Sequence, residues 1–288
     1  MDKQPGSDKL VDTGWVAANL KNPAVRIIEV GDLKDPDAYF AGHIPGAVHW
    51  PWEEVLWETG MREIVSPESF AALMRQSGIG HDTIVVLYSS LCQYATYAFW
   101  VCAMRGHDNV RIMNGNRALW INEGRPISRE IPVINPSDYP LRPVDETSRI
   151  GRESVRAGLN NPDRVLLDMR TPEEFTGERV SPPWFEVDHG AVKKGRIPGA
   201  RHFYYLNLLN QDETYKPADQ LLRAFSDVGA SPDREIVFYC RLSHRATLGW
   251  FVARYLLGYR RVKVYDGSWT EWGSMFGMPI VNLSIKKA

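Results

Sequence analysis

The stretch that decides the fold is Glu235-Ile-Val-Phe-Tyr-Cys-Arg-Leu-Ser-His-Arg245. Its first five residues form a short apolar and aromatic run, which predicts a buried strand. From Ala246 to Leu257 apolar residues follow at helical spacing, and Gly258 supplies a stop signal. The sequence therefore predicts a strand, a tight loop that begins with Cys240, and then a helix.

This loop combines a cysteine with two arginines, Arg241 and Arg245. Backbone N–H groups at a helix N-terminus and nearby guanidinium groups favour the thiolate form of a cysteine. A single cysteine at a strand end is often only a packing residue, but two arginines beside an apolar thiol are costly. We therefore expect Cys240 to be an ionised nucleophile.

The composition indicates a water-soluble protein of one large or two ordinary domains. The chain has 288 residues, of which 44% are apolar and 24% charged, and a formal net charge of -1. This balance gives no reason to expect nucleic acid or an anionic membrane as partner. The three cysteines, at 92, 102 and 240, form neither a disulfide framework nor a Cys-x-x-Cys zinc pair. We expect no metal and no cofactor.

The N-terminal segment and the hydropathy pattern predict a cytoplasmic location. Residues 1–10 are polar and lack an apolar signal core, and no apolar run is long enough to span a bilayer. In the cytoplasm the thiols stay reduced.

The sequence contains an internal repeat. Three pairs of segments carry it, and they are Gly42-His-Ile-Pro-Gly-Ala47 with Gly195-Arg-Ile-Pro-Gly-Ala200, Ile84-Val-Val-Leu-Tyr88 with Ile236-Val-Phe-Tyr239, and Asn109-Val-Arg-Ile-Met-Asn-Gly115 with Arg261-Val-Lys-Val-Tyr-Asp-Gly267. The period is too long for a solenoid, so we infer two copies of one domain. Each copy alternates strands and helices, which predicts an α/β fold with a mostly parallel sheet and helices on both faces.

The domain boundaries follow from the repeat and from the prolines. We expect the first domain over residues 1–125, a stiff linker over residues 126–150 with prolines at 126, 132, 136, 140 and 143, and the second domain over residues 151–288. The second copy carries an insertion, at about residues 177–194, that the first copy lacks. This insertion is expected either to lie over the active loop or to be a surface elaboration.

Aligning the two copies at Tyr88 and Tyr239 locates the chemistry. Ser89 then falls opposite Cys240, Ser90 opposite Arg241, and Tyr94 opposite Arg245. The first copy thus has neither a thiol nor a cation at these positions, so we assign activity to the second copy. Cys92 and Cys102 are expected to be packing residues.

The repeat, the two Gly-x-Ile-Pro-Gly-Ala turns, the strand–Cys–loop–helix and the ending Tyr265-Asp-Gly-Ser-Trp-Thr-Glu-Trp272 resemble the tandem-domain rhodanese family of sulfurtransferases. The resemblance covers nearly the whole chain. It implies that Cys240 is catalytic and carries a persulfide, which needs no further cofactor. It also implies transfer of sulfur from a small anionic donor, thiosulfate or 3-mercaptopyruvate, to cyanide or a thiol.

The loop sequence favours thiosulfate as donor. Thiosulfate-type vertebrate members of the family read Cys-Arg-Lys-Gly-Val-Thr and mercaptopyruvate-type members Cys-Gly-Ser-Gly-Val-Thr. Arg241 matches the thiosulfate type. Leu242 stands where that type has lysine, and Ser243 stands where it has glycine. Arg245 restores the lost charge. The expected substrate-binding residues are Arg241, Leu242, Ser243, His244 and Arg245.

Five further residues are expected to support the site, and they are Asp168, Arg170, Glu174, Trp269 and Trp272. Asp168 and Arg170 end a strand beside the loop, and Arg170 is expected to be a structural ion-pair partner rather than a substrate ligand. Glu174 stands where mercaptopyruvate-type members often have an arginine, and it is expected to pair with Arg170 or Arg245. The two tryptophans either wall the pocket or pack in the core. His244 is expected either to face solvent or, when protonated, to add positive charge to the loop.

Two alternatives belong to other functional classes. Dual-specificity phosphatases of the same fold place five residues between cysteine and arginine, whereas four separate Cys240 from Arg245, which matches a single sulfur better than a phosphate. A persulfide carrier that serves a partner protein uses the same loop as an enzyme, so the sequence leaves this alternative open. A protein sulfur acceptor is thus a further expected partner.

Overall fold

The computed structural model describes residues 8–31, 35 and 37–285. They divide into two compact units. The N-terminal unit comprises residues 8–146 and 211–215, and the C-terminal unit comprises residues 147–210 and 216–285. Among the helices of the described residues, none is both long enough and apolar enough to cross a membrane.

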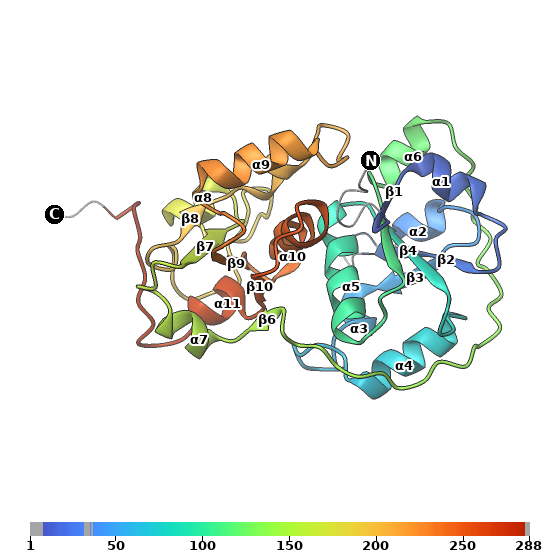
Figure 1. Ribbon diagram of the computed structural model, residues 1–288, viewed down its shortest axis with the longest axis horizontal. Helices are drawn as coiled ribbons and strands as arrows, with labels where there is room; N and C mark the ends of the chain where they lie inside the picture. Colours follow the sequence, from blue (N-terminus) through green and yellow to red (C-terminus); the bar gives the residue numbers. More distant parts are fainter. Residues whose placement is uncertain (1–7, 32–34, 36, 286–288) are drawn as a thin grey trace. The chain divides into compact units, whose positions relative to one another are not determined.

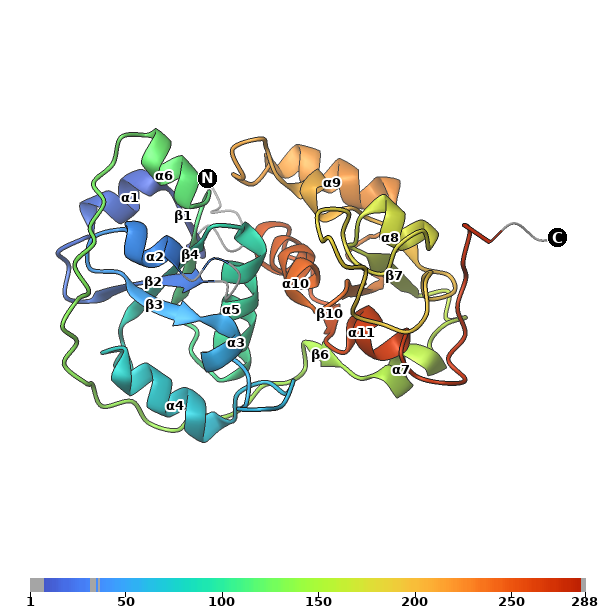
Figure 2. The ribbon, with the colours of Figure 1, turned by 180° about the vertical axis from the view of Figure 1, so that it is seen from behind.

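The N-terminal unit is a five-stranded parallel sheet with the strand order β1-β5-β4-β2-β3 and helices on both faces (Figures 1 and 2). In chain order its elements are β1 (Leu10–Val11), α1 (Thr13–Ala18), β2 (Val25–Gly31), α2 (Asp37–Ala41), β3 (Val48–Pro51), α3 (Trp52–Val55), α4 (Pro67–Gln76), β4 (Ile84–Ser89), α5 (Cys92–Met104), β5 (Val110–Met113) and α6 (Arg117–Asn122).

The C-terminal unit repeats this plan with the order β6-β10-β9-β7-β8. Its elements are β6 (Arg149–Ile150), α7 (Arg152–Ala157), β7 (Arg164–Asp168), α8 (Pro172–Thr176), β8 (Arg201–His202), the 3₁₀ helix η1 (Tyr205–Leu208), α9 (Ala218–Asp227), β9 (Glu235–Tyr239), α10 (His244–Phe251), the π-helix η2 (Val252–Leu256), β10 (Val262–Tyr265) and α11 (Ser268–Trp272). The predicted α/β fold with two parallel sheets is confirmed.

The two sheets share one register. Glu29 lies opposite Tyr88 in the N-terminal unit, and Asp168 lies opposite Tyr239 in the C-terminal unit. Cys240 directly follows Tyr239, as Ser89 follows Tyr88. The serine and the cysteine therefore occupy the same position, at the carboxyl end of the central strand.

Two segments differ from their sequence-based description. The helix expected from Ala246 begins at His244, and its last part is the π-helix η2, where Leu257 donates its N–H to the carbonyl of Val252 at 3.0 Å. The predicted linker packs along the N-terminal unit up to residue 146. Tyr139 is buried there, and Asp145 donates its N–H to the carbonyl of Met104 at 2.8 Å.

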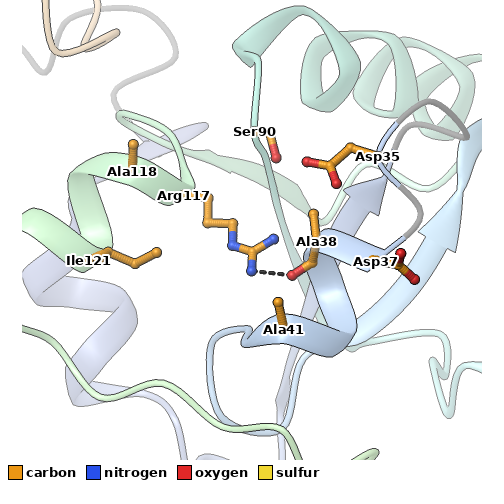
Figure 3. A pocket seen from close by; sticks show the side chains of 8 residues that line it. All are labelled: Asp35, Asp37, Ala38, Ala41, Ser90, Arg117, Ala118 and Ile121. Carbon is orange, nitrogen blue, oxygen red and sulfur yellow. Dashed lines mark hydrogen bonds between the residues drawn. The ribbon is translucent and has the colours of Figure 1, made fainter.

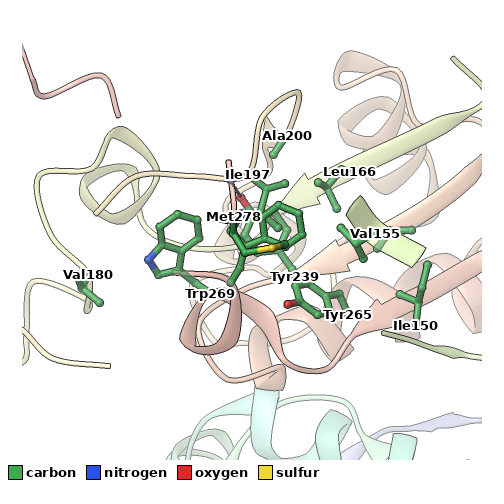
Figure 4. Packing of buried hydrophobic residues seen from close by; sticks show 12 residues of the cluster. Ile150, Val155, Leu166, Val180, Ile197, Ala200, Tyr239, Tyr265, Trp269 and Met278 are labelled. Atoms are coloured by element: carbon green, nitrogen blue, oxygen red, sulfur yellow. Dashed lines mark hydrogen bonds between the residues drawn. The ribbon is translucent and has the colours of Figure 1, made fainter. Parts of the chain in front are cut away.

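One face of the C-terminal sheet packs against an aromatic core. Figure 4 shows Tyr239, Tyr265 and Trp269 together with Ile197 and Met278. These side chains are at most 7% exposed. Aromatic side chains bury large areas and dominate core energetics, so this cluster fixes helix α11 and the 195–200 turn beneath β9.

A buried hydrogen-bond network joins the 195–200 turn to the strand that leads to Cys240. The Tyr239 hydroxyl donates to Asp168 Oδ2 at 2.5 Å and accepts the N–H of Ile197 at 3.3 Å. Arg170 pairs with the same carboxylate at 2.7 Å and donates to the carbonyl of Gly195 at 2.7 Å. Burial and the charge of Asp168 raise the pKa of Tyr239 well above its usual range, so its hydroxyl stays a donor.

Replacing Tyr239 by Phe removes this hydroxyl and leaves Asp168 with one donor fewer in a dry environment. We expect a loss of about 1–3 kcal/mol in the free energy of unfolding of the C-terminal unit, measured by urea titration with tryptophan fluorescence. Tyr265→Phe is the control, because its hydroxyl donates to Glu271, whose side chain is 35% exposed. A larger loss from Tyr265→Phe than from Tyr239→Phe would contradict the role of the network.

Candidate active site

Cys240 is held at the end of β9 by its backbone. Its N–H donates to the hydroxyl of Ser268 at 3.2 Å, and its carbonyl accepts the N–H of Trp269 at 2.9 Å. Ser268 has a φ of +50°, which places its hydroxyl in this position at some backbone cost. Cys240 is 1% exposed. Its backbone is thus fixed between the central strand and the start of α11.

In the loop after Cys240, several backbone N–H groups take no part in the hydrogen bonds of a helix or sheet. Ser243 adopts the left-handed conformation, with a φ of +69°, directly before α10, and its carbonyl accepts the N–H of Thr247 at 2.9 Å. Within the described residues, the N–H groups of 241, 242, 243, 245 and 246 donate to no acceptor. Turns and helix N-termini with such N–H groups form anion-binding concavities.

Arg245 is matched by a buried carboxylate. Its guanidinium donates to Glu174 at 2.6 and 2.9 Å, and Glu174 also closes a capping box with Thr171 at the start of α8. Burial lowers the pKa of Arg245, but the charge of Glu174 outweighs it and raises the pKa above its ordinary value. Of the two partners expected for Glu174, the structure shows Arg245, and Arg170 pairs with Asp168.

Arg241 has no such carboxylate partner within the described residues. Its side chain is largely buried, its Nε atom lacks a hydrogen-bond acceptor, and its guanidinium lies 5.4 Å from the centre of the Phe185 ring. Burial and then the charge of Arg245 lower the pKa of Arg241. Its hydrogen-bond donors therefore remain available to a ligand.

Both guanidinium groups interact electrostatically with Cys240. The charge of ionised Cys240 is among the effects that favour the protonated form of Arg241 and also of Arg245. Glu174 cancels one of the two positive charges. One further anion at the loop would therefore balance the remaining positive charge.

The other residues that were expected at the site differ from one another in how far they are exposed. Leu242 is partly exposed. Of the two expectations for His244, the solvent-facing one is wrong, because its side chain is only 6% exposed. Trp269 and Trp272 are fully buried in the aromatic core and donate to the carbonyls of Lys193 and Pro279 at 3.0 and 2.8 Å. They hold the backbone beneath the loop.

The insertion contributes residues that the sequence did not single out. Phe185 and Gly190 lie against the Arg241 side chain, and a Cβ atom at Gly190 would be 2.5 Å from Arg241 Nε. Of the two expectations for residues 177–194, contact with the active loop is the one that the structure shows. In the sequence only the glycine at 190 points to a close approach, and it does not identify the partner; the structure shows its φ of +116°.

The equivalent loop of the N-terminal unit is different in chemistry. Ser89 uses its hydroxyl within the loop, donating to the carbonyl of Leu91 at 2.6 Å and accepting the N–H of Ala95 at 3.3 Å. Burial raises the pKa of Cys92 well above its usual range, and the charge of Glu213 adds to this. Burial also raises the pKa of Cys102. Both thiols are therefore protonated and buried, as expected for packing residues.

A pocket of about 420 Å³ beside Ser90 has two carboxylates in its lining, Asp35 and Asp37. Figure 3 shows Asp35 and Ser90 on one side of this pocket and Ala118 and Ile121 on the other. The cation in its lining, Arg117, pairs with Glu29 at 3.1 Å. The described lining of this pocket thus carries two carboxylates, whereas the Cys240 loop carries two arginines.

Comparison with curated proteins gives full-length relatives. The sulfur carrier protein TtuD of Thermus thermophilus is 42% identical over 275 residues, which cover 94% of this chain and 95% of that protein. Two proteins with the name "Putative thiosulfate sulfurtransferase", from Haloferax volcanii and Mycobacterium tuberculosis, are 37% and 36% identical. Those alignments cover 95% of this chain and 96% and 97% of the two proteins.

Solved structures share the fold. The wild-type structure of EanB has a TM-score of 0.83 and 25% identity, with 98% of this chain and 71% of that chain covered. The anaerobic ergothioneine biosynthesis enzyme of Chlorobium limicola, in complex with trimethyl histidine, also has a TM-score of 0.83, at 24% identity, covering 98% of this chain and 72% of that one.

The family model described as "Rhodanese-like domain" matches the chain twice, over residues 12–123 and 152–275. The two matches cover both parallel sheets, and the second contains Cys240 and its loop. The chain therefore belongs to the rhodanese family, as a tandem-domain sulfurtransferase or sulfur carrier.

Proposed function

We propose that this protein is a thiosulfate sulfurtransferase that moves a sulfane sulfur through a persulfide on Cys240. The observation that carries the proposal is the group of Cys240, Arg241, Arg245 and Glu174 in the loop between β9 and α10. A cationic loop stabilises a sulfur nucleophile, the anion that it attacks and the anion that leaves.

In the first half-reaction the Cys240 thiolate attacks the outer sulfur of thiosulfate. The sulfur–sulfur bond of the donor breaks, and sulfite leaves with the bonding electron pair. The new sulfur–sulfur bond makes Cys240 a persulfide anion, so the charge of the site is the same before and after the step. We assign stabilisation of the terminal sulfur to the loop N–H groups, which have no acceptor within the described residues.

In the second half-reaction an acceptor attacks the outer sulfur of the persulfide. Cyanide becomes thiocyanate, or a thiolate becomes a persulfide, and the electron pair of the broken bond returns to Cys240. Two separate half-reactions give ping-pong kinetics.

The two arginines have different roles in this scheme. Arg245 is committed to Glu174 through two charged hydrogen bonds, so it supplies a fixed charge to the loop. Arg241 retains donors for a ligand, and a planar guanidinium suits an oxyanion with several acceptor oxygens. We assign donor binding to Arg241 and loop stability to Arg245.

A second candidate function is that of a persulfide carrier that serves a partner protein. The name of the relative at 42% identity, a sulfur carrier protein, favours it. The names of several further relatives at 34–37% identity favour thiosulfate as donor. The chemistry at Cys240 is the same in both functions, and they differ in whether the free donor or a protein loads the sulfur.

Steady-state thiocyanate formation tests the choice of donor. We expect kcat/KM for thiosulfate to exceed that for 3-mercaptopyruvate by about tenfold or more, the size of effect that one additional charged hydrogen bond gives. A preference for 3-mercaptopyruvate would overturn the thiosulfate assignment. Cys240→Ser is the inactive control.

The comparison of free and protein-bound donors separates the enzyme from the carrier. If the protein is an enzyme, thiosulfate alone at millimolar concentration supports many turnovers with cyanide, at a rate within the usual range of about 1–1000 per second. Loading of Cys240 by a persulfidated protein, without turnover on thiosulfate, would favour the carrier instead.

Glu174→Gln tests the fixed-charge role of Arg245. The amide keeps the shape of the side chain but leaves a buried guanidinium uncompensated, so we expect a loss of about 3 kcal/mol in the free energy of unfolding. Asp219→Asn is the matched control, because it removes the carboxylate of an exposed pair with Arg223 and is expected to change stability by about 0.5 kcal/mol or less. Equal effects of the two substitutions, by urea titration, would contradict this role.

A further inference from the structure

One carboxylate holds together the insertion at residues 177–194, here called the 177–194 loop, through bonds within the insertion. Asp188 accepts the N–H groups of Val180 and Ser181 at 2.8 and 2.9 Å and pairs with Lys194 at 3.2 Å. Burial raises the pKa of Asp188, but these bonds outweigh it and lower the pKa to about 2. This tie is therefore constant above about pH 4 and is lost only as the pH falls towards 2.

Both ends of the loop are attached to the body of the C-terminal unit. Near its start, Val180 is part of the aromatic core and is 3% exposed. Near its end, Lys193 donates its N–H to the carbonyl of Gly273 at 2.9 Å and accepts the indole N–H of Trp269 at 3.0 Å. The loop thus has defined anchor points on the same helix, α11, that holds the backbone of Cys240.

The middle of the loop contacts Arg241. The Phe185 ring lies 5.4 Å from the guanidinium carbon, close enough for a cation–π interaction. Gly190 has a φ of +116°, and a Cβ atom there would lie 2.5 and 2.7 Å from Arg241 Nε and Nη2. A side chain at residue 190 would therefore displace the guanidinium, which fills the space that the glycine leaves.

We infer that the 177–194 loop is a positioning element of the active site. Phe185 and Gly190 fix the Arg241 guanidinium in its place beside Cys240, so that an incoming oxyanion donor meets a cation that is already oriented. This inference rests on the proposed function for its consequence in catalysis. The positioning of the Arg241 charge relative to the Cys240 thiol is inferred from the contacts of Arg241 alone.

The test compares two alkylating reagents at Cys240, the anionic iodoacetate and the neutral iodoacetamide, with the modified cysteine identified by peptide mass. A cation held near the thiol raises the rate of the anionic reagent relative to the neutral one. We expect Gly190→Ala to lower this rate ratio by about fivefold, because the added methyl group moves the Arg241 charge. Gly277→Ala is the control, since Gly277 also has a positive φ, of +74°, and a methyl group there would meet none of the described residues within 4 Å.

The double variant shows whether the effect passes through Arg241. Arg241→Ala alone is expected to lower the ratio, and Gly190→Ala in that background is expected to change it no further. Equal ratios for Gly190→Ala and the wild type, or an undiminished effect of Gly190→Ala without Arg241, would overturn the inference.

Failure of the proposed function has a different signature. A wild-type protein that shows the expected ratio but forms no thiocyanate from thiosulfate retains the positioning role and loses the sulfurtransferase assignment. Cys240 that reacts with neither reagent would overturn both, because a sealed thiol can neither be loaded nor be influenced by a neighbouring charge.

Discussion

The structure of the site depends on the neutralisation of charge in a buried place. Two guanidinium groups lie close to a thiol that is almost completely buried, and one carboxylate, Glu174, holds one of them. Buried charges are tolerated when they are paired and hydrogen-bonded. Arg245 meets this condition through Glu174, whereas Arg241 has no such carboxylate partner within the described residues and is left to pair with an anion at the loop. The arrangement therefore favours an anion at the loop in every state of the proposed cycle.

Comparison of the two units distinguishes the features that the fold requires from those that the chemistry requires. Both units have the same parallel sheet and the same strand register. In both, the isoleucine N–H of the Gly-x-Ile-Pro-Gly turn donates a hydrogen bond to a buried tyrosine hydroxyl, that of Tyr88 in one unit and Tyr239 in the other. They differ in the loop that follows the central strand. Serine replaces the cysteine there, and the adjacent pocket carries carboxylates. A sheet of this kind positions a loop at its carboxyl edge whatever the loop contains.

The sequence predicted the fold because its repeat and its strand–helix alternation depend on local patterns. It also predicted that Arg170 is a structural ion-pair partner, and the structure pairs it with Asp168. The partner of Glu174 required the position of α8 relative to α10, which no local pattern supplies. The same holds for Phe185 and Gly190, whose contact with Arg241 joins segments about 50 residues apart. The burial of His244 likewise depends on packing between elements, on which a local pattern gives no information.

The central claim is that Cys240 accepts and keeps one sulfur atom, and intact mass spectrometry measures it directly. The wild-type protein is treated with thiosulfate, the reagent is removed, and the intact mass is measured without reductant. Cys240→Ser is treated and measured in the same way. The account predicts an added mass of one sulfur atom on the wild type, removed by cyanide, and no addition on the variant. A wild type without added mass, or a variant that gains the same mass, would contradict it.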